Sequence, residues 1–137
     1  MTDAGDLQRS IARLDVDECL ALLGHRVVGR VAFICGDGPV IVPVNYLLDE
    51  GTVVFRTTYG TTLDTIGSGA RVAFEVDAID EATHSGWSVV VAGKAEEIWR
   101  PEELERARNL PLQPWAPGDR AHYVRILPSS ISGRRID

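Results

Sequence analysis

Three apolar runs of strand length follow one another near the start of the chain, and only short turn sequences separate them. The runs cover residues 27–35, 39–48 and 52–58, and the letters between them read GDG and DEG. Short glycine-containing turns join antiparallel neighbours, so the pattern predicts three strands connected by tight hairpins. This requirement restricts the chain to folds built around an antiparallel sheet.

The middle run is apolar on both of its faces. Val42, Val44 and Tyr46 share one face, whereas Ile41 and Pro43 lie on the other. We therefore expect both faces of this strand to be covered. Pro43 has no N–H to donate to a neighbouring strand, so it marks an edge, a bulge, or a place where something other than a strand lies alongside.

The rest of the chain adds short helices and further strands. Asp15 and Glu18 can form a capping box for a helix that ends at Gly24. Further elements are a short helix around LDTI, a helix over 101–110, and strands over 70–79, 87–99 and 121–136, the last region forming one strand or two. The pattern predicts a mainly β fold in which six or seven mostly antiparallel strands close into a small barrel, because closure removes exposed edges.

Length and composition are those of one ordinary globular domain. The chain has 137 residues, 45% of them hydrophobic, and we assign residues 1–137 to a single domain with 1–14 as a flexible N-terminal segment. The polar N-terminus and the short apolar runs predict neither a signal peptide nor a membrane anchor. A formal net charge of -6 argues against a nucleic-acid partner. Cys19 and Cys35 match no metal or redox spacing, so we expect no metal site and a cytoplasmic protein with reduced thiols.

The segment RTTYGTTL gathers groups suited to a phosphate at the start of the predicted short helix. They are Arg56, Thr57, Gly60, Thr61 and Thr62. A guanidinium can contact phosphate in a bidentate manner, hydroxyls donate hydrogen bonds, and a helix start presents unpaired N–H groups. The alternative is that Thr61 or Thr62 only caps the helix while Arg56 is a solvated strand residue. The residues alone leave both interpretations open.

Six stretches of the sequence together resemble a known family. They read GRVAF, DGPVIVPVNYLLDEGTVVFRT, GTTL, VAFEVD, GWSVVVAGKAEEI and ISGRRI, within roughly residues 15–137. They resemble the pyridoxamine 5′-phosphate oxidase-like, FMN-binding split-barrel family, and most closely its short bacterial members, grouped with flavin-nucleotide-binding and nitroimidazole-resistance proteins. The resemblance implies a six-stranded antiparallel split β-barrel and a homodimer with FMN sites in its interface.

The resemblance also implies which residues lie beside the flavin ring. Pro43, Val44 and Asn45, in the motif PVNY, would border the isoalloxazine. A backbone freed from pairing at Pro43 suits this role, since it can hydrogen-bond the ring edge. Trp87 and Ser88 would reach the flavin from the other side, as residues of the partner subunit.

The phosphate end of the flavin is implied to lie at the RTTYGTTL segment. Arg56 and Thr57 would line the ribityl chain and the phosphate, and Gly60, Thr61 and Thr62 would cradle the phosphate. Many relatives carry lysine where Thr62 stands. The resemblance therefore leaves Arg56 as the main positive charge for the phosphate.

The function that follows is an FMN-binding oxidoreductase acting on an unknown small-molecule substrate. No side chain stands out as a catalytic acid or base, which suits redox chemistry carried by a cofactor. Three alternatives stay open: a reductase that uses the deazaflavin coenzyme F-420, a flavin-binding protein without catalysis, and a structural dimeric barrel without a ligand. Haem is a further alternative cofactor, since a few relatives bind it. Oxidation of pyridoxamine phosphate itself is not expected in so short a chain.

Four further residues have a possible place at the site and an ordinary explanation. His84 is a candidate proton donor to the substrate, or an ordinary loop histidine. Trp115 is a candidate to cover the open face of the cofactor, or it fills an apolar gap. Arg134 and Arg135 resemble family arginines near the site but equally suit an ordinary surface. Their roles stay open at this point.

Overall fold

A computed structural model describes residues 10–58, 60–118 and 120–137, with the backbone alone at 61–63. The strands are β1 (Ile11–Leu14), β2 (Val28–Cys35), β3 (Gly38–Asp49), β4 (Thr52–Thr57), β5 (Ser68–Asp80), β6 (Ser85–Ile98) and β7 (His122–Ile136). The helices are α2 (Val16–Leu23), α3 (Thr61–Ile66) and α4 (Pro101–Arg108). Among these residues, no helix has the length and apolar character needed to cross a bilayer.

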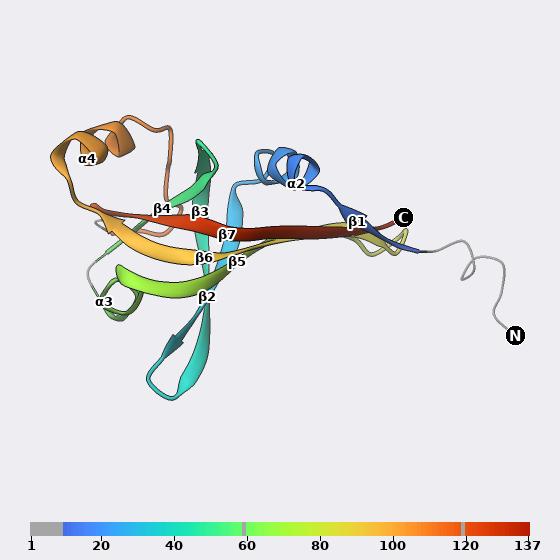
Figure 1. The fold of residues 1–137 in the computed structure, drawn as a ribbon, viewed down its shortest axis with the longest axis horizontal. Coiled ribbons are helices and arrows are strands. Elements are labelled where there is room, and N and C mark those ends of the chain that lie inside the picture. The colour runs from blue at the N-terminus through green and yellow to red at the C-terminus, as the bar shows by residue number, and fades with distance from the viewer. Residues whose placement is uncertain (1–9, 59, 119) are drawn as a thin grey trace, which may run out of the picture.

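The strands form one antiparallel sheet that returns on itself. Its order is β1-β7-β4-β3-β2-β5-β6, and a further pairing between β6 and β7 closes it into a ring. Figure 1 shows the β2–β3 hairpin projecting to one side of the long β5, β6 and β7 strands. The prediction of a mainly β, antiparallel fold with short helices is confirmed.

One element differs from the expectation, and the alternative left open for the tail is decided. The described sheet holds seven strands, and the additional one is β1, which lies inside the segment 1–14 that was expected to be flexible. Residues 11–14 pair with 133–136 of β7, so backbone hydrogen bonds order a stretch whose sequence is not strand-like. The tail forms one strand, β7, because it stays paired along β6 with only a register shift at Ala92/Gly93.

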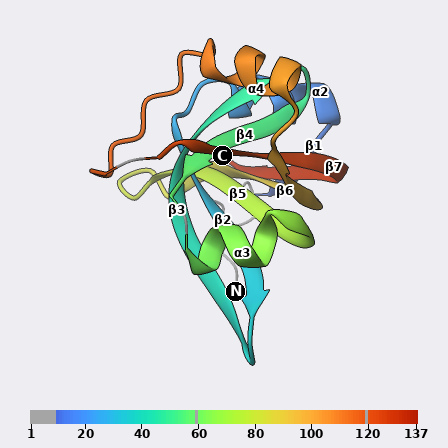
Figure 2. The same ribbon diagram turned by 90° about the vertical axis from the view of Figure 1, so that its left-hand side faces the viewer.

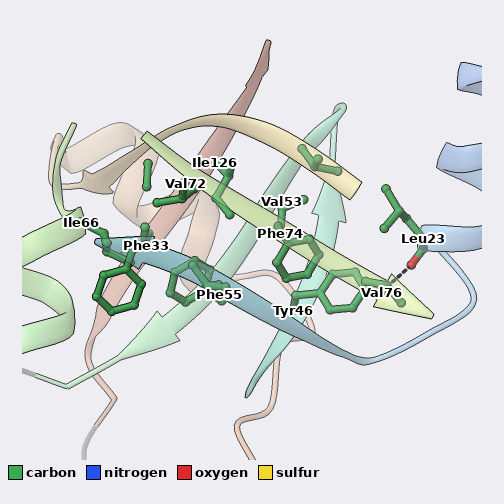
Figure 3. Close-up of a cluster of buried hydrophobic side chains, with 14 of the residues drawn as sticks. Leu23, Phe33, Tyr46, Val53, Phe55, Ile66, Val72, Phe74, Val76 and Ile126 are labelled. Carbon is green, nitrogen blue, oxygen red and sulfur yellow. Dashed lines mark hydrogen bonds between the residues drawn. The ribbon is translucent and has the colours of Figure 1, made fainter. Parts of the chain in front are cut away.

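The predicted caps position the first helix. The Asp15 side chain accepts a hydrogen bond from the Glu18 N–H at 2.8 Å, and the Glu18 carboxylate accepts one from the Asp15 N–H at 3.2 Å. This reciprocal pair satisfies two N–H groups that a helix start leaves without partners. At the other end of α2, the Leu23 carbonyl accepts a hydrogen bond of 2.5 Å from the Tyr46 hydroxyl, which ties the helix to β3 (Figure 3).

The aromatic core holds β3 and β5 together inside the ring. Tyr46 meets Phe74 edge-to-face, with ring centroids 4.9 Å apart, a favoured arrangement for two aromatic rings. Phe55 and Phe74 are fully buried (Figure 3). Burial raises the pKa of the Tyr46 hydroxyl to about 12, so this group stays protonated and keeps its hydrogen bond.

Strands β3 and β4 separate after a short paired stretch. They pair only from Tyr46 to Asp49 on β3 and from Thr52 to Phe55 on β4. Beyond that point β4 continues against β7, where Arg56 lies opposite Tyr123, while the earlier part of β3 pairs with β2. Pro43 lies in this diverging part of β3, opposite Arg30 of β2. The expectation that Pro43 marks an edge of local pairing is therefore confirmed.

A cluster of charges lies on the β2–β5 surface. The Arg30 guanidinium lies 3.2 Å from a Glu75 oxygen and 3.4 Å from an Asp77 oxygen. Burial, followed by the neighbouring Asp77, raises the pKa of Glu75 to about 7, and Arg30 opposes this rise only partly. Glu75 and Asp77 share one guanidinium, and the ionised form of Glu75 is the one that is disfavoured.

Gly29 of β2 has no room for a side chain. A Cβ at this position would lie 2.2 Å from a ring atom of Phe74, whereas a Cβ at Gly38 would meet nothing within 4 Å. We expect Gly29→Ala to lower the free energy of unfolding by about 1–3 kcal/mol, the usual cost of overfilling a core. Gly38→Ala, the matched control, should change it by less than about 0.5 kcal/mol. Denaturant unfolding measures both, and equal effects would contradict the packing described for Phe74.

The raised pKa of Glu75 makes stability depend on pH. Between the ordinary value of 4.5 and about 7, the folded protein holds a proton that the unfolded chain releases. Protein stability should therefore fall as pH rises across this window, relative to Glu75→Gln, which cannot titrate. Glu81→Gln, an exposed change, serves as the control. If the free energy of unfolding depends on pH in the same way in wild type and in Glu75→Gln, the raised pKa of Glu75 is contradicted.

Candidate functional site

A cavity of about 340 Å³ lies where β3 and β4 separate. The residues that line it are Val42, Pro43, Val44, Asn45, Phe55, Arg56, Thr57, Thr58, Gly60, Pro114, Ala116 and Arg120. One wall is the diverging part of β3 and another is the end of β4. The third wall comes from the segment that follows α4, which runs down beside β3 in Figure 2.

Most of the residues predicted to hold a flavin meet in this cavity. Pro43, Val44 and Asn45 line it from β3, and Arg56 and Thr57 line it from β4. Thr57 is the buried polar residue among them, with 7% of its surface exposed. The two stretches are close because their strands pair at Tyr46 and Phe55, immediately next to them along the chain.

The predicted phosphate cradle is described in part. Gly60 lines the cavity and has a φ of +152°, a backbone conformation that favours glycine. The predicted short helix is confirmed as α3, which begins at Thr61. The side chains of Thr61 and Thr62 lie outside the described residues.

The proline-rich loop, defined here as residues 109–118, is held against both strands. The Trp115 N–H donates a hydrogen bond of 2.7 Å to Oδ1 of Asn45. Nη1 of Arg56 donates one of 3.4 Å to the Leu112 carbonyl. Trp115 as a whole is 71% exposed and borders a neighbouring cavity of about 380 Å³. Trp115 therefore contacts the site through its backbone, and Asn45 lines both cavities.

The electrostatic character of the cavity is positive. Arg56 and Arg120 are both among its lining residues, and no carboxylate is among those described. The whole chain has a formal net charge of -6, so the cavity is locally positive in a protein whose net charge is negative. Two guanidinium groups on one cavity favour an anionic ligand.

Arg120 is the residue that sequence reasoning missed. It follows the proline-rich loop and precedes β7, and its sequence neighbours form no recognisable binding motif. Its place in the cavity depends on the pairing of β7 with β4, which brings Tyr123 opposite Arg56. Only this long-range register could have identified it.

Trp87 and Ser88 lie elsewhere in the chain's fold. They line a second cavity of about 640 Å³ at the end of the β5–β6 hairpin, together with His84 and Arg134. Arg135 is half-buried and pairs with Trp87 across β6 and β7. Within one chain, the structure therefore does not bring Trp87 and Ser88 to the cavity between β3 and β4.

Comparison with known proteins agrees with the sequence resemblance. A family model described as pyridoxamine 5′-phosphate oxidase matches residues 15–135. An uncharacterised protein of Mycobacterium tuberculosis is 37% identical over 133 residues, which cover 93% of this chain and 87% of the relative.

Two solved structures are similar along nearly their whole length. An FAD-binding protein from Mycobacterium smegmatis is 34% identical with a TM-score of 0.76, covering 90% of this chain and 98% of that one. An FAD-binding protein from Mesorhizobium loti is 25% identical with a TM-score of 0.77, covering 91% and 97%. The family match and the shared fold agree over the same residues, and the chain belongs to the pyridoxamine 5′-phosphate oxidase family.

Proposed function

We propose that this chain binds a flavin nucleotide, FMN or FAD, in the cavity between β3, β4 and the proline-rich loop, and that it serves as an oxidoreductase. The observation that carries the proposal is the combination of two unlike walls in one cavity. The β3 wall is a backbone edge with apolar side chains, suited to a planar ring, and the other walls carry two arginines and a buried threonine, suited to a phosphate.

The residues fit such a cofactor. Nε of Arg120 is buried and has no hydrogen-bond partner among the described residues, and a phosphate oxygen is an acceptor that would satisfy it. Val42, Pro43 and Val44 offer an apolar surface to a ring. Relatives of the same fold are described as FAD-binding proteins, which supports a flavin over other anionic ligands.

The protein's part in the chemistry would be to bind, orient and shield. A bound flavin supplies the electron-transfer chemistry that side chains lack. Pro43 leaves the β3 edge without an N–H at one position. The backbone of the neighbouring Val44 and Asn45 can hydrogen-bond the edge of the ring. The proline-rich loop covers one side and limits access of water. No carboxylate among the described lining residues would repel the phosphate.

The proposal includes a homodimer and a cytoplasmic location. Trp87 and Ser88 can reach a flavin only from a second subunit, since they line a separate cavity. That cavity is bordered by exposed apolar side chains, Ile11 and Ile79, whose exposed fractions are 59% and 67%. An apolar surface of this kind favours a protein partner. Cys19 and Cys35 form no disulfide, which agrees with a reducing compartment.

Flavin titration tests the cofactor. We expect the ligand-free protein to quench the fluorescence of FMN, FAD and riboflavin, and to bind the phosphorylated flavins more tightly. Val44→Trp should fill the cavity and weaken every flavin about ten-fold or more. Ile41→Trp, on an exposed position of the same strand, should leave the affinities unchanged. Melting temperatures of the ligand-free variants verify that each folds. Binding of coenzyme F-420 alone, with none of the three flavins, would contradict the proposal.

Sedimentation tests the dimer. We expect a dimer at micromolar concentration that buries about 1,000 Å² or more on each protomer. Ile79→Asp should shift the protein toward monomer, because it puts a charge into the apolar surface around the second cavity. Ile34→Asp, equally exposed at 65% but on the β2–β3 hairpin, should not. A well-folded wild-type monomer at this concentration would contradict the interface.

A further inference from the structure

The two arginines of the cavity differ in how they are bonded. Arg56 uses its guanidinium on the protein itself: Nε donates a hydrogen bond of 2.9 Å to the Arg120 carbonyl, and Nη1 donates one of 3.4 Å to the Leu112 carbonyl. The same group lies over the ring of Tyr123, 5.2 Å from its centroid. Arg56 thus connects β4 to both ends of the segment that forms the third wall of the cavity.

Arg120 is bonded in the opposite way. Its backbone carbonyl is held by Arg56, but its side chain makes no ion pair with any described residue. Nε of Arg120 is buried without a hydrogen-bond partner, and it is the only buried side-chain nitrogen or oxygen in that condition in the described part of the chain. Buried donors are nearly always satisfied in folded proteins, so one left unsatisfied beside a cavity indicates a missing acceptor.

Two other arginines differ from Arg120, because each donates hydrogen bonds to carboxylates. Arg125 donates to Glu96 and Glu103, and Arg106 donates to Asp49. The protein is rich in carboxylates, yet none of the described ones reaches Arg120. The guanidinium of Arg120 is therefore available to an external anion.

We propose that Arg120 is the residue that binds the phosphate of the flavin nucleotide, and that Arg56 is a positioning residue that fixes Arg120 by holding its peptide carbonyl. This inference rests on the proposed function, and it assigns different roles to two cations on the same cavity. A guanidinium that already gives hydrogen bonds to two carbonyls has fewer N–H groups left for a phosphate. A guanidinium with an unsatisfied N–H can bind a phosphate without breaking any bond within the protein.

The test measures the phosphate increment, defined as the ratio of the riboflavin dissociation constant to the FMN dissociation constant. Arg120→Ala should reduce this ratio about ten- to a hundred-fold, the usual effect of losing a charge-assisted contact. Riboflavin affinity and the melting temperature of the ligand-free protein should stay unchanged. Arg120→Lys should restore part of the ratio, because it returns the charge without the planar donor pair. Arg108→Ala, an exposed arginine of α4, is the matched control and should change nothing.

Arg56 should respond differently in the same assay. Arg56→Ala should lower the melting temperature of the ligand-free protein, weaken riboflavin as well as FMN, and reduce the ratio in part, because the loop loses its attachment and Arg120 loses the contact that positions it. In the Arg56→Ala background, Arg120→Ala should cause a smaller further loss of the ratio than it does alone, since the two act through one contact. Raising the salt concentration should reduce the ratio in wild type but not in Arg120→Ala.

The outcomes separate the inference from the proposed function. If wild type binds FMN more tightly than riboflavin and Arg120→Ala keeps the full ratio, the inference is wrong while the flavin site stands. If Arg56→Ala abolishes the ratio without changing ligand-free stability, Arg56 binds the phosphate and the assignment is again wrong. If wild type binds neither flavin, the proposed function fails, and the inference fails with it.

Discussion

The candidate site exists because two neighbouring strands pair for only a few residues and then part. Tyr46 and Phe55 are the last partners of β3 and β4 before the strands diverge, and both are buried in the core. Pro43 suits the divergence, since a proline cannot donate to a continued ladder. A sheet paired along its full length would leave no cavity here. Every lining residue from the two strands therefore depends on this interruption of the hydrogen-bond ladder.

The segment after α4 adds a third wall to the gap between the strands, and polar side chains hold the segment there. Asn45 and Arg56 come from the two diverging strands, and each bonds the backbone of this segment. Hydrogen bonds to a guanidinium are stronger than neutral ones, so a few contacts can hold a proline-rich chain that has no regular structure. The same contacts bring a second arginine to the cavity. A protein that is acidic on average thus presents a locally positive cavity without a basic surface.

Sequence reasoning identified what is encoded locally. The strand alternation and the Asp15–Glu18 capping box each depend on neighbours a few residues apart, and both are observed. The β2–β3 ladder runs through Pro43, which lacks a paired strand only on the side of β4. The residues of β3 that line the cavity were expected from the family resemblance, and those of β4 from the resemblance and the local segment RTTYGTTL. Arg120 and β1 were missed, because their places depend on pairing with distant segments: Arg56 and Arg120 are 64 positions apart. The role of Arg56 also depends on this distance, since its sequence neighbours do not reveal which carbonyls it meets.

A crystal structure of the protein with FMN would show directly whether a flavin nucleotide occupies the gap between β3 and β4. We expect electron density for the ring against Pro43–Asn45 and for the phosphate beside Arg120. A separate cavity of about 450 Å³ also carries basic side chains, those of Lys94, Arg100 and Arg125. Density for FMN there, with the gap between β3 and β4 unchanged, would contradict the account.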